Sequence, residues 1–352
     1  MNQTNKSGKK LYIEYLRCMA MFGVVLAHVC ITARTDFPDH NRYEEAFAVG
    51  VTNILHFAVP VFFMITGALF LNPAKKITID KLLKKYTSKY ALGILVFGWG
   101  FALMEQLFDG FNNLPHKVGK SFVLMLEGKS WNHMWYLYAL VGIMLSMPIW
   151  KMVVQVCEQE KNMLMLRYIV ICIFVFNSVL VFLDEITGCH IDITFPVGVI
   201  YIGYLFLGYM IDREYIKIKR ITALIMTLGA GAVIIFGSCV YAIKGYEWGQ
   251  DIGKYTSPFI LILSVGIFVL GKDIIADKCG GEHKVLSFIS KQSYGVYIMH
   301  MFVINVLYKL LKISPFGNGM VVKVAIFWMV TSAVSIVMVA IGRKIPVIGK
   351  LL

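Results

Sequence analysis

Charged residues are scarce in this chain. Only 16% of its 352 residues are Asp, Glu, Lys or Arg, whereas 58% are hydrophobic. A soluble domain of this length exposes more charge, so the composition excludes that class and predicts a polytopic membrane protein. The seven cysteines form no C-x-x-C pair, and several fall inside apolar runs. They are interpreted as small buried residues, and neither a disulfide framework nor a metal site is expected.

Acidic residues are scarcer still than basic ones. The chain has 21 Asp and Glu against 34 Lys and Arg, which gives a net charge of +13. Such an excess can indicate nucleic-acid binding. Here, however, most of the Lys and Arg fall in alternate connections between the apolar runs, as the positive-inside rule predicts for a membrane protein. The expected partner is therefore the lipid bilayer, and no nucleic acid is expected.

Ten apolar runs are each close to the roughly 20 residues that a membrane helix needs. The fold is therefore predicted to be all-α, a polytopic bundle of about ten transmembrane helices with both termini cytoplasmic. It is expected to form a single transmembrane domain over residues 1–352, with no separate soluble domain. The runs are 11–33, 53–72, 90–108, 133–155, 167–184, 195–212, 221–243, 255–271, 293–311 and 319–341.

The first run carries three ionisable residues, Glu14, Arg17 and His28. Such residues are costly inside a membrane and indicate a functional site. In a helix, Arg17 and His28 lie about 20° apart around the axis and about 16 Å apart along it. Glu14 lies one turn below Arg17 and is expected to pair with it. Arg17 is a fixed cation for a phosphate or carbonyl group, and His28 suits proton transfer.

Polar and aromatic residues gather where later helices are predicted to reach the outer surface. His133 opens a dense cluster with Trp135 and Tyr136, and these are candidate substrate-binding residues. In the ninth run, Tyr297 and His300 share a face and are added to that set, with His300 expected near mid-membrane. Each of these residues also has an ordinary structural interpretation as an interfacial or hydrogen-bonded side chain. Asn305, further along this run, is expected to hydrogen-bond to another helix.

Four motifs together resemble one known family. The residues Tyr15-Leu16-Arg17, followed after ten residues by His28, resemble the R-x10-H signature of the acyltransferase-3 family of bacterial membrane acyltransferases. The other three motifs, in family order, are Pro60-Val61-Phe62-Phe63-Met64-Ile65-Thr66-Gly67, His133-Met134-Trp135-Tyr136-Leu137 and Ser293-Tyr294-Gly295-Val296-Tyr297-Ile298-Met299-His300. Thr66 stands where the family usually has Ser and joins the substrate-binding candidates, although close helix packing also explains it and Gly67.

The resemblance implies a function and a location. Family members transfer an acyl group, most often acetyl, from cytoplasmic acyl-CoA to a hydroxyl of an outward-facing glycan, lipid-linked saccharide or small acceptor across the bacterial cytoplasmic membrane. His28 would then be the catalytic base or a transient acyl carrier. Arg17 would bind or orient acetyl-CoA, and Glu14 would support Arg17. Tyr136, Tyr297 and Ser293 are candidate donors to the oxyanion, and the sequence does not select among them.

One family feature is missing from the sequence. The larger glycan O-acetyltransferases carry an R-x-x-R pair in a cytoplasmic segment, and this chain has none. The candidate cations for the phosphates of coenzyme A are then Lys84, Lys85 and Lys89. No metal is expected, because the His residues lack nearby carboxylate or thiolate ligands. A transporter or flippase that exports a glycan or a small polar solute is the alternative function, since a polar track through ten helices also describes carriers.

Overall fold

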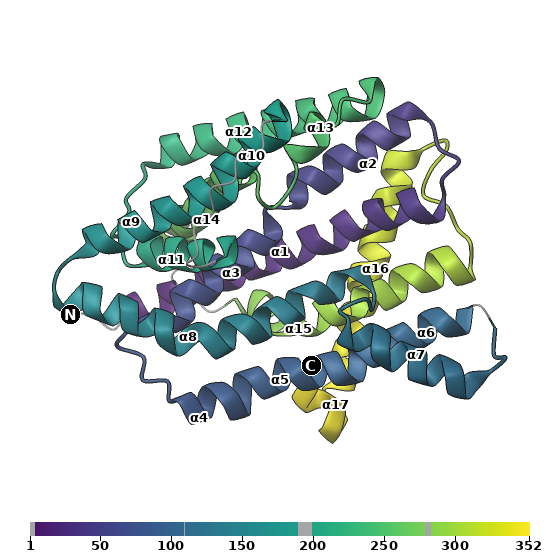
Figure 1. Cartoon of the computed structure of the whole chain (residues 1–352), viewed down its shortest axis with the longest axis horizontal. Helices are drawn as coiled ribbons and strands as arrows, with labels where there is room; N and C mark the ends of the chain where they lie inside the picture. Colours follow the sequence, from purple (N-terminus) through teal and green to yellow (C-terminus); the bar gives the residue numbers. More distant parts are fainter. Residues whose placement is uncertain (1–3, 109, 189–198, 279–282) are drawn as a thin grey trace.

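The computed structural model describes residues 4–108, 110–188, 199–278 and 283–352, and all regular elements in these ranges are helices (Figure 1). The α-helices are α1 (Thr4–Asp36), α2 (Arg42–Leu55), α3 (Ala58–Phe70), α4 (Ile79–Lys81), α5 (Ser88–Gly93), α6 (Trp99–Phe108), α7 (Leu114–Leu126), α8 (Trp135–Gln159), α9 (Met163–Phe174), α10 (Leu180–Thr187), α11 (Ile200–Asp212), α12 (Arg220–Lys244), α13 (Trp248–Asp251), α14 (Pro258–Lys278), α15 (Lys284–Asn305), α16 (Met320–Gly342) and α17 (Pro346–Leu351). The remaining turns are η1 (Leu82–Thr87), η2 (Ile94–Gly98), η4 (Val175–Val179) and η5 (Val306–Leu310), which are π-helical, and the 3-10 turn η3 (Asn132–Met134).

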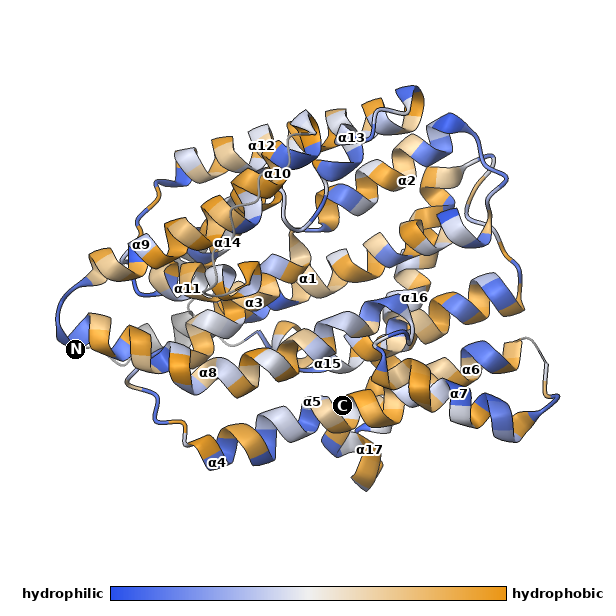
Figure 2. Ribbon diagram, in the orientation of Figure 1, coloured by the Kyte–Doolittle hydropathy of each residue, from blue (hydrophilic) through white to orange (hydrophobic). Residues whose placement is uncertain are grey.

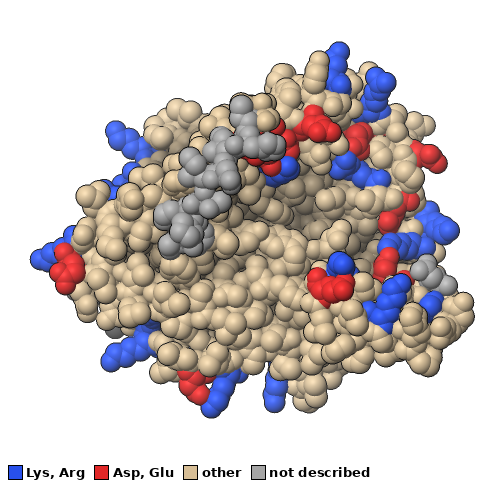
Figure 3. Space-filling view, viewed as in Figure 1, with Lys and Arg blue, Asp and Glu red and all other residues tan. Residues whose placement is uncertain are grey.

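The described part of the chain confirms an all-α polytopic bundle. Eight helical stretches in it are long and apolar enough to cross a membrane. Of the two other predicted runs, 195–212 coincides with α11, and 293–311 coincides with α15 and its extension η5. Residues 195–198 of the sixth predicted run lie outside the described residues. Hydrophilic residues gather in the connections at the two ends of the long axis (Figure 2). A broad area without charged side chains crosses the middle of the face in Figure 3.

Helix α1 is the central element. It packs against α2, α3, α14, α15 and α16, and it runs through the middle of the bundle (Figure 1). Its fully buried residues Leu16, Val25 and Val29 are apolar. The polar residues Arg17 and His28 are only partly buried, because they border internal cavities. This position makes α1 the element that carries functional groups through the bundle.

The second predicted span is two helices. Helices α2 and α3 are separated at His56 and Phe57, and Pro60 falls in the first turn of α3. Proline has no N–H and is favoured in the first turn of a helix, so a helix start just before Pro60 is expected. The break turns the His56 ring toward the α13–α14 connection, where Nδ1 hydrogen-bonds to the Gly253 carbonyl at 2.6 Å.

Helices α3 and α11 approach each other closely. A Cβ on Gly67 would lie 1.9 Å from the Leu205 carbonyl oxygen, and one on Gly208 would lie 2.0 Å from that of Met64. This confirms the packing role expected for Gly67. Helix α11 has 13 residues, about 20 Å in length, and nearly all of them are buried. It is therefore enclosed by protein, which explains why a helix shorter than the bilayer core is stable here.

Candidate active site

Three histidine rings meet inside the bundle. His28 comes from α1, His133 from the turn η3 before α8, and His300 from α15. The ring centroids are 6.2 Å apart for His28 and His133, 5.0 Å for His28 and His300, and 5.1 Å for His133 and His300. The sequence predicted a common height only for His28 and His133, and the structure adds His300 to this cluster. Among the described residues, no group of His, Cys, Asp and Glu has the geometry of a metal site.

Two of the three rings have a defined tautomer. Nε2 of His133 bonds to the Ile298 carbonyl at 3.2 Å, and Nδ1 of His300 bonds to the Val296 carbonyl at 3.1 Å. A carbonyl oxygen only accepts hydrogen bonds, so each bonded nitrogen carries the proton. The other nitrogen of each ring is buried and has no partner among the described residues. Each of these two rings therefore keeps one nitrogen lone pair that no described residue uses.

A second feature is a cationic cavity of about 330 Å³, which lies toward the end of α1 that carries Arg17. Its wall contains Arg17 and residues from the η1–α5 segment, the inner half of α15 and the end of α16. Five of the lining residues are basic and none is acidic. The basic ones are Arg17, Lys85, Lys89, Lys291 and Arg343. Such a wall selects an anion.

Arg17 has no ion-pair partner among the described residues. Among the described residues no carboxylate lies within ion-pair distance of its guanidinium, so the expected Glu14–Arg17 pair is not formed. The Glu14 carboxylate instead accepts a hydrogen bond from Ser287 Oγ at 3.2 Å. The helical spacing was correct, but the carboxylate turns toward the start of α15. Arg17 thus remains free to bind a ligand in the cationic cavity.

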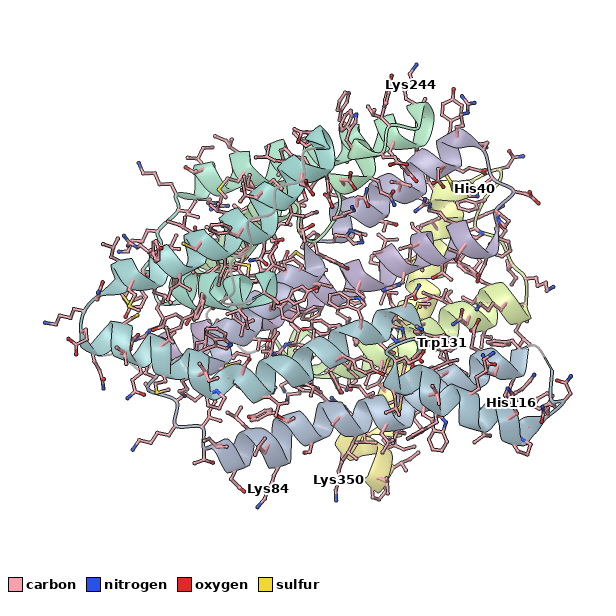
Figure 4. The ribbon with its side chains drawn as sticks, viewed as in Figure 1. His40, Lys84, His116, Trp131, Lys244 and Lys350 are labelled. Atoms are coloured by element: carbon pink, nitrogen blue, oxygen red, sulfur yellow. The ribbon has the colours of Figure 1, made fainter. Side chains whose placement is uncertain are left out.

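The three predicted cofactor lysines lie in different places. Lys85 and Lys89 line the cationic cavity, and Lys89 Nζ lies 4.4 Å from the centroid of the Tyr294 ring. Lys84 does not line it. Its side chain is 79% exposed and pairs with Asp80 at 2.7 Å, pointing away from the bundle (Figure 4). Lys85 and Lys89 are four residues apart and share one helical face, whereas Lys84 lies on a different face.

Sequence reasoning missed two cations of this cavity, Lys291 and Arg343. Arg343 donates hydrogen bonds to the Lys291 carbonyl at 2.6 Å and to the Leu352 carbonyl at 2.9 Å. Burial lowers the pKa of the Arg343 guanidinium from its ordinary value. Arg343 follows the last residue of α16, and Lys291 lies in α15 just before the ninth predicted run. Basic residues are expected in these inner segments as topology signals, so their position in the sequence did not distinguish them. Their proximity depends on how α15 and α16 cross.

An aromatic cavity of about 440 Å³ lies next to the cationic cavity, and Tyr136 and Tyr297 stand between the two. Trp135 forms part of its wall and packs against Tyr255 with centroids 5.5 Å apart. Most of the lining is apolar or aromatic. The polar groups of the wall come from His28, Thr52, His56, Asn132 and His133. The predicted outer cluster of aromatic residues is therefore a cavity wall rather than an interfacial belt.

Tyr136 and Tyr297 separate the cationic cavity from the aromatic cavity, because both residues line both spaces. Their rings are T-shaped, with centroids 5.3 Å apart. The Tyr297 hydroxyl donates to the His133 carbonyl. The Tyr136 hydroxyl makes no hydrogen bond within the described residues. Thr66, a further predicted substrate residue, lines the cationic cavity, and its Oγ1 donates to the Phe62 carbonyl at 2.9 Å.

A third space, the outer polar cavity, has a volume of about 270 Å³. It shares His28, Ile31 and Asn132 with the aromatic cavity. The cationic and outer polar cavities have no lining residue in common. The three cavities therefore form a series, from cationic to aromatic to polar, and His28 stands at the second junction.

This series supports transfer between two ligands that enter from opposite ends. The cationic end can hold an anion, and the outer polar end can hold a polar molecule beyond His28. A basic imidazole placed between them can remove a proton from one ligand as it reacts with the other. The arrangement matches the chemistry of group transfer to a hydroxyl.

Comparison with known proteins agrees with this geometry. The family model described as an acyltransferase domain, that of the acyltransferase-3 family, matches residues 10–342, nearly the whole chain. Curated proteins and solved structures give no match. The family match covers all three histidines, Arg17 and the helices that form the cavities. The chain therefore belongs to the acyltransferase-3 family and is a multi-pass membrane acyltransferase.

Proposed function

We propose that this acyltransferase moves an acyl group, most often acetyl, from cytoplasmic acyl-CoA to a hydroxyl of an outward-facing glycan, lipid-linked saccharide or small acceptor. The bacterial cytoplasmic membrane is the expected location. One observation carries the proposal. A cavity lined by five cations and no acid leads through two tyrosines to the ring of His28.

The cationic cavity suits the phosphate groups of coenzyme A. Arg17 has no carboxylate partner among the described residues, and the guanidinium group binds phosphate or carbonyl oxygens well. Lys85 and Lys89 add charge on the η1–α5 side. The buried hydroxyls of Ser290 and Tyr294 have no hydrogen-bond partner in the described structure and face the same space. A phosphorylated ligand would satisfy these groups.

The aromatic cavity suits the acyl end of the same ligand. Tyr136 and Tyr297 line both cavities, so a flexible arm anchored among the cations would pass between these rings. Beyond them the wall is mainly apolar and ends at His28. An uncharged thioester is compatible with such a wall, whereas a phosphate is not. The donor's charged and uncharged parts are thus matched by separate cavities.

The proposed reaction is direct transfer with His28 as the base. The acceptor hydroxyl gives its proton to the free imidazole nitrogen of His28, and its oxygen attacks the thioester carbonyl carbon. The new C–O bond forms, the C–S bond breaks, and coenzyme A leaves as a thiolate. The imidazolium of His28 then protonates that thiolate, which restores the neutral ring.

Tyr136 is the proposed donor to the oxyanion. Its hydroxyl has no partner among the described residues and lies where the arm would enter. The hydroxyl of Tyr297 is already bonded to the His133 carbonyl, which makes it the weaker candidate. Ser293 lines only the cationic cavity, away from His28. A donor placed in advance stabilises the charge that develops on the carbonyl oxygen.

The test uses membranes that retain surface glycan and acetyl-CoA labelled on the acetyl group. The wild-type protein should release coenzyme A and transfer label to glycan. His28→Ala should abolish transfer while the protein still binds acetyl-CoA, and Arg17→Ala should weaken acetyl-CoA binding. Lys84→Gln is the matched control, because Lys84 does not line the cavity, and it should behave as wild type. Solute flux without coenzyme A release from any acyl donor would favour the transporter alternative.

A further inference from the structure

We infer that the outer polar cavity is a saccharide-binding subsite that presents a hydroxyl group to His28. This inference rests on the proposed function and assigns the acceptor to a cavity separate from the aromatic one. The cavity lies among α1, α6, the connection between α7 and α8, and the end of α15, and Figure 4 labels Trp131 in its wall.

The charge of the cavity wall favours a neutral ligand. Two carboxylates and two ammonium groups line it, so their formal charges cancel. These groups are Asp36, Glu105, Lys129 and Lys309. The cationic cavity, in contrast, has five positive groups and no negative one. A phosphorylated ligand that fits the first cavity has no comparable partner here.

Glu105 is fully engaged by the protein. Its two oxygens accept hydrogen bonds from Lys309 Nζ at 2.6 Å and from Trp131 Nε1 at 2.9 Å. Phe101 stacks on the Trp131 indole with centroids 4.3 Å apart and an interplanar angle of 11°. These contacts fix one wall of the cavity before any ligand binds, and preorganisation of this kind lowers the cost of binding.

Two other groups in the wall lack partners. Asp36 Oδ2 is buried and accepts no hydrogen bond within the described structure. Asn305 is 2% exposed, yet its side-chain amide makes no hydrogen bond to any described residue. The sequence predicted an interhelical bond for this amide, and the structure instead places it on the cavity. Buried groups without partners are costly, so a ligand that satisfies them gains binding energy.

The chemistry of these groups indicates a polyhydroxylated ligand. Asp36 accepts hydrogen bonds, Lys129 donates them, and the amides of Gln106 and Asn305 do both. A molecule with several hydroxyls also donates and accepts at each of them. The pattern therefore fits a saccharide better than a lipid tail, which needs an apolar wall, or an anion.

The position of His28 provides the geometric link. His28 lines the outer polar and aromatic cavities but not the cationic one. If the acyl arm fills the aromatic cavity, an acceptor must reach His28 from the remaining side. The outer polar cavity is that side, and it shares Asn132 with the aromatic cavity at the same junction.

The test measures protection of cysteines from a small thiol reagent, with purified protein in lipid nanodiscs. Gln106→Cys places a thiol in the outer polar cavity, and Thr52→Cys places one in the aromatic cavity. Mass spectrometry reads each site separately from the native cysteines. Glucose and N-acetylglucosamine are the saccharide probes, and glycine is the zwitterion without hydroxyls. We expect the saccharides to slow labelling of Gln106→Cys at least fivefold and to leave Thr52→Cys unchanged.

Second-site variants test the assigned residues. In the Gln106→Cys protein, Asp36→Asn or Asn305→Ala should weaken saccharide protection at least fivefold. Asp39→Asn is the matched control, because Asp39 is an exposed acid on the same segment that does not line the cavity. It should leave protection unchanged.

Three outcomes would overturn the inference. They are protection of Thr52→Cys alone by saccharides, protection of Gln106→Cys by glycine alone, and no protection by either saccharide. Labelling needs no turnover, so this result is separate from the proposed function. If acetyl-CoA fails to bind while saccharides still protect Gln106→Cys, the proposed donor site is wrong and the saccharide subsite stands.

Discussion

His28 of α1 and His300 of α15 lie with their ring centroids 5.0 Å apart, although they come from opposite ends of the sequence. His300 holds its own ring by a bond to the Val296 carbonyl, and its free nitrogen has no partner among the described residues. We therefore expect His300 to be a positioning residue that orients or polarises the His28 ring without touching the acceptor.

The two histidines should differ in the size of their effects. His28→Ala removes the base, and we expect kcat for acyl transfer to fall by about 10²–10⁴-fold. His300→Asn removes only the neighbour, and kcat should fall by roughly tenfold, with an altered pH profile and little change in the KM for acyl-CoA. Coenzyme A release measured across pH checks both variants. An equal loss in both, with unchanged pH profiles, would contradict this division of roles.

Two lysines five residues apart on the chain should respond differently to neutralisation. Lys89 lines the cationic cavity, whereas Lys84 is exposed and paired with Asp80. Lys89→Gln should raise the KM for acyl-CoA several-fold, since it removes a cation from an otherwise unneutralised site. Lys84→Gln should leave KM unchanged, because exposed ion pairs contribute little. Initial rates over a range of acyl-CoA concentrations compare them, and equal shifts would show that the cavity is not the donor site.

Removing single hydroxyls should separate the roles of the two junction tyrosines. Tyr136→Phe should lower kcat by about 10²–10³-fold, the loss typical of a removed oxyanion donor, while the Kd for acyl-CoA stays close to that of wild type. Tyr297→Phe loses the bond to the His133 carbonyl and should destabilise the protein by about 0.5–1.5 kcal/mol, with a smaller loss of kcat. Single-turnover rates and thermal unfolding distinguish them. A larger kcat loss in Tyr297→Phe would reverse the assignment.

The contact between α3 and α11 should not tolerate an added methyl group. Gly208→Ala would place a Cβ 2.0 Å from the Met64 carbonyl oxygen, so one backbone must move. Overpacking of this kind costs about 1–3 kcal/mol. We expect a lower Tm for the purified variant. Gly229→Ala in α12 is the control, because no atom lies within 4 Å of its added Cβ, and its Tm should be unchanged or higher.

Much of the helical architecture could be predicted from the sequence, because the length of an apolar run reflects the thickness of the bilayer. The exceptions have physical causes. Helix α11 is short because protein, and not lipid, surrounds it. Helix α7 lies between the third and fourth predicted runs, and its 13 residues are too few to cross a bilayer, so the search for spanning runs did not find it. The run 53–72 was predicted as one helix, and the break between α2 and α3 precedes Pro60, which lies in the first turn of α3.

The site was predictable only within single helices. The shared face of Arg17 and His28 follows from helical geometry, and both residues border cavities as expected. The clustering of His300 with His28, the position of Arg343 beside Lys291 and the unpaired amide of Asn305 depend on how separate helices cross. Periodicity along one chain segment contains no information on crossing angles. The Glu14–Arg17 pair was wrong because spacing places two residues on a face but does not fix their rotamers.

The separation of charge among the cavities has an electrical consequence. All five cations of the cationic cavity lie at one end of the series of cavities, while the four charges of the outer polar cavity cancel. Each elementary charge moved across a membrane potential of about 100 mV involves roughly 2.3 kcal/mol of work. In the proposed reaction, phosphates anchored in the cationic cavity would not move through that potential, and an acyl group has no charge. The transfer would therefore proceed at the same rate in an energised and a de-energised membrane.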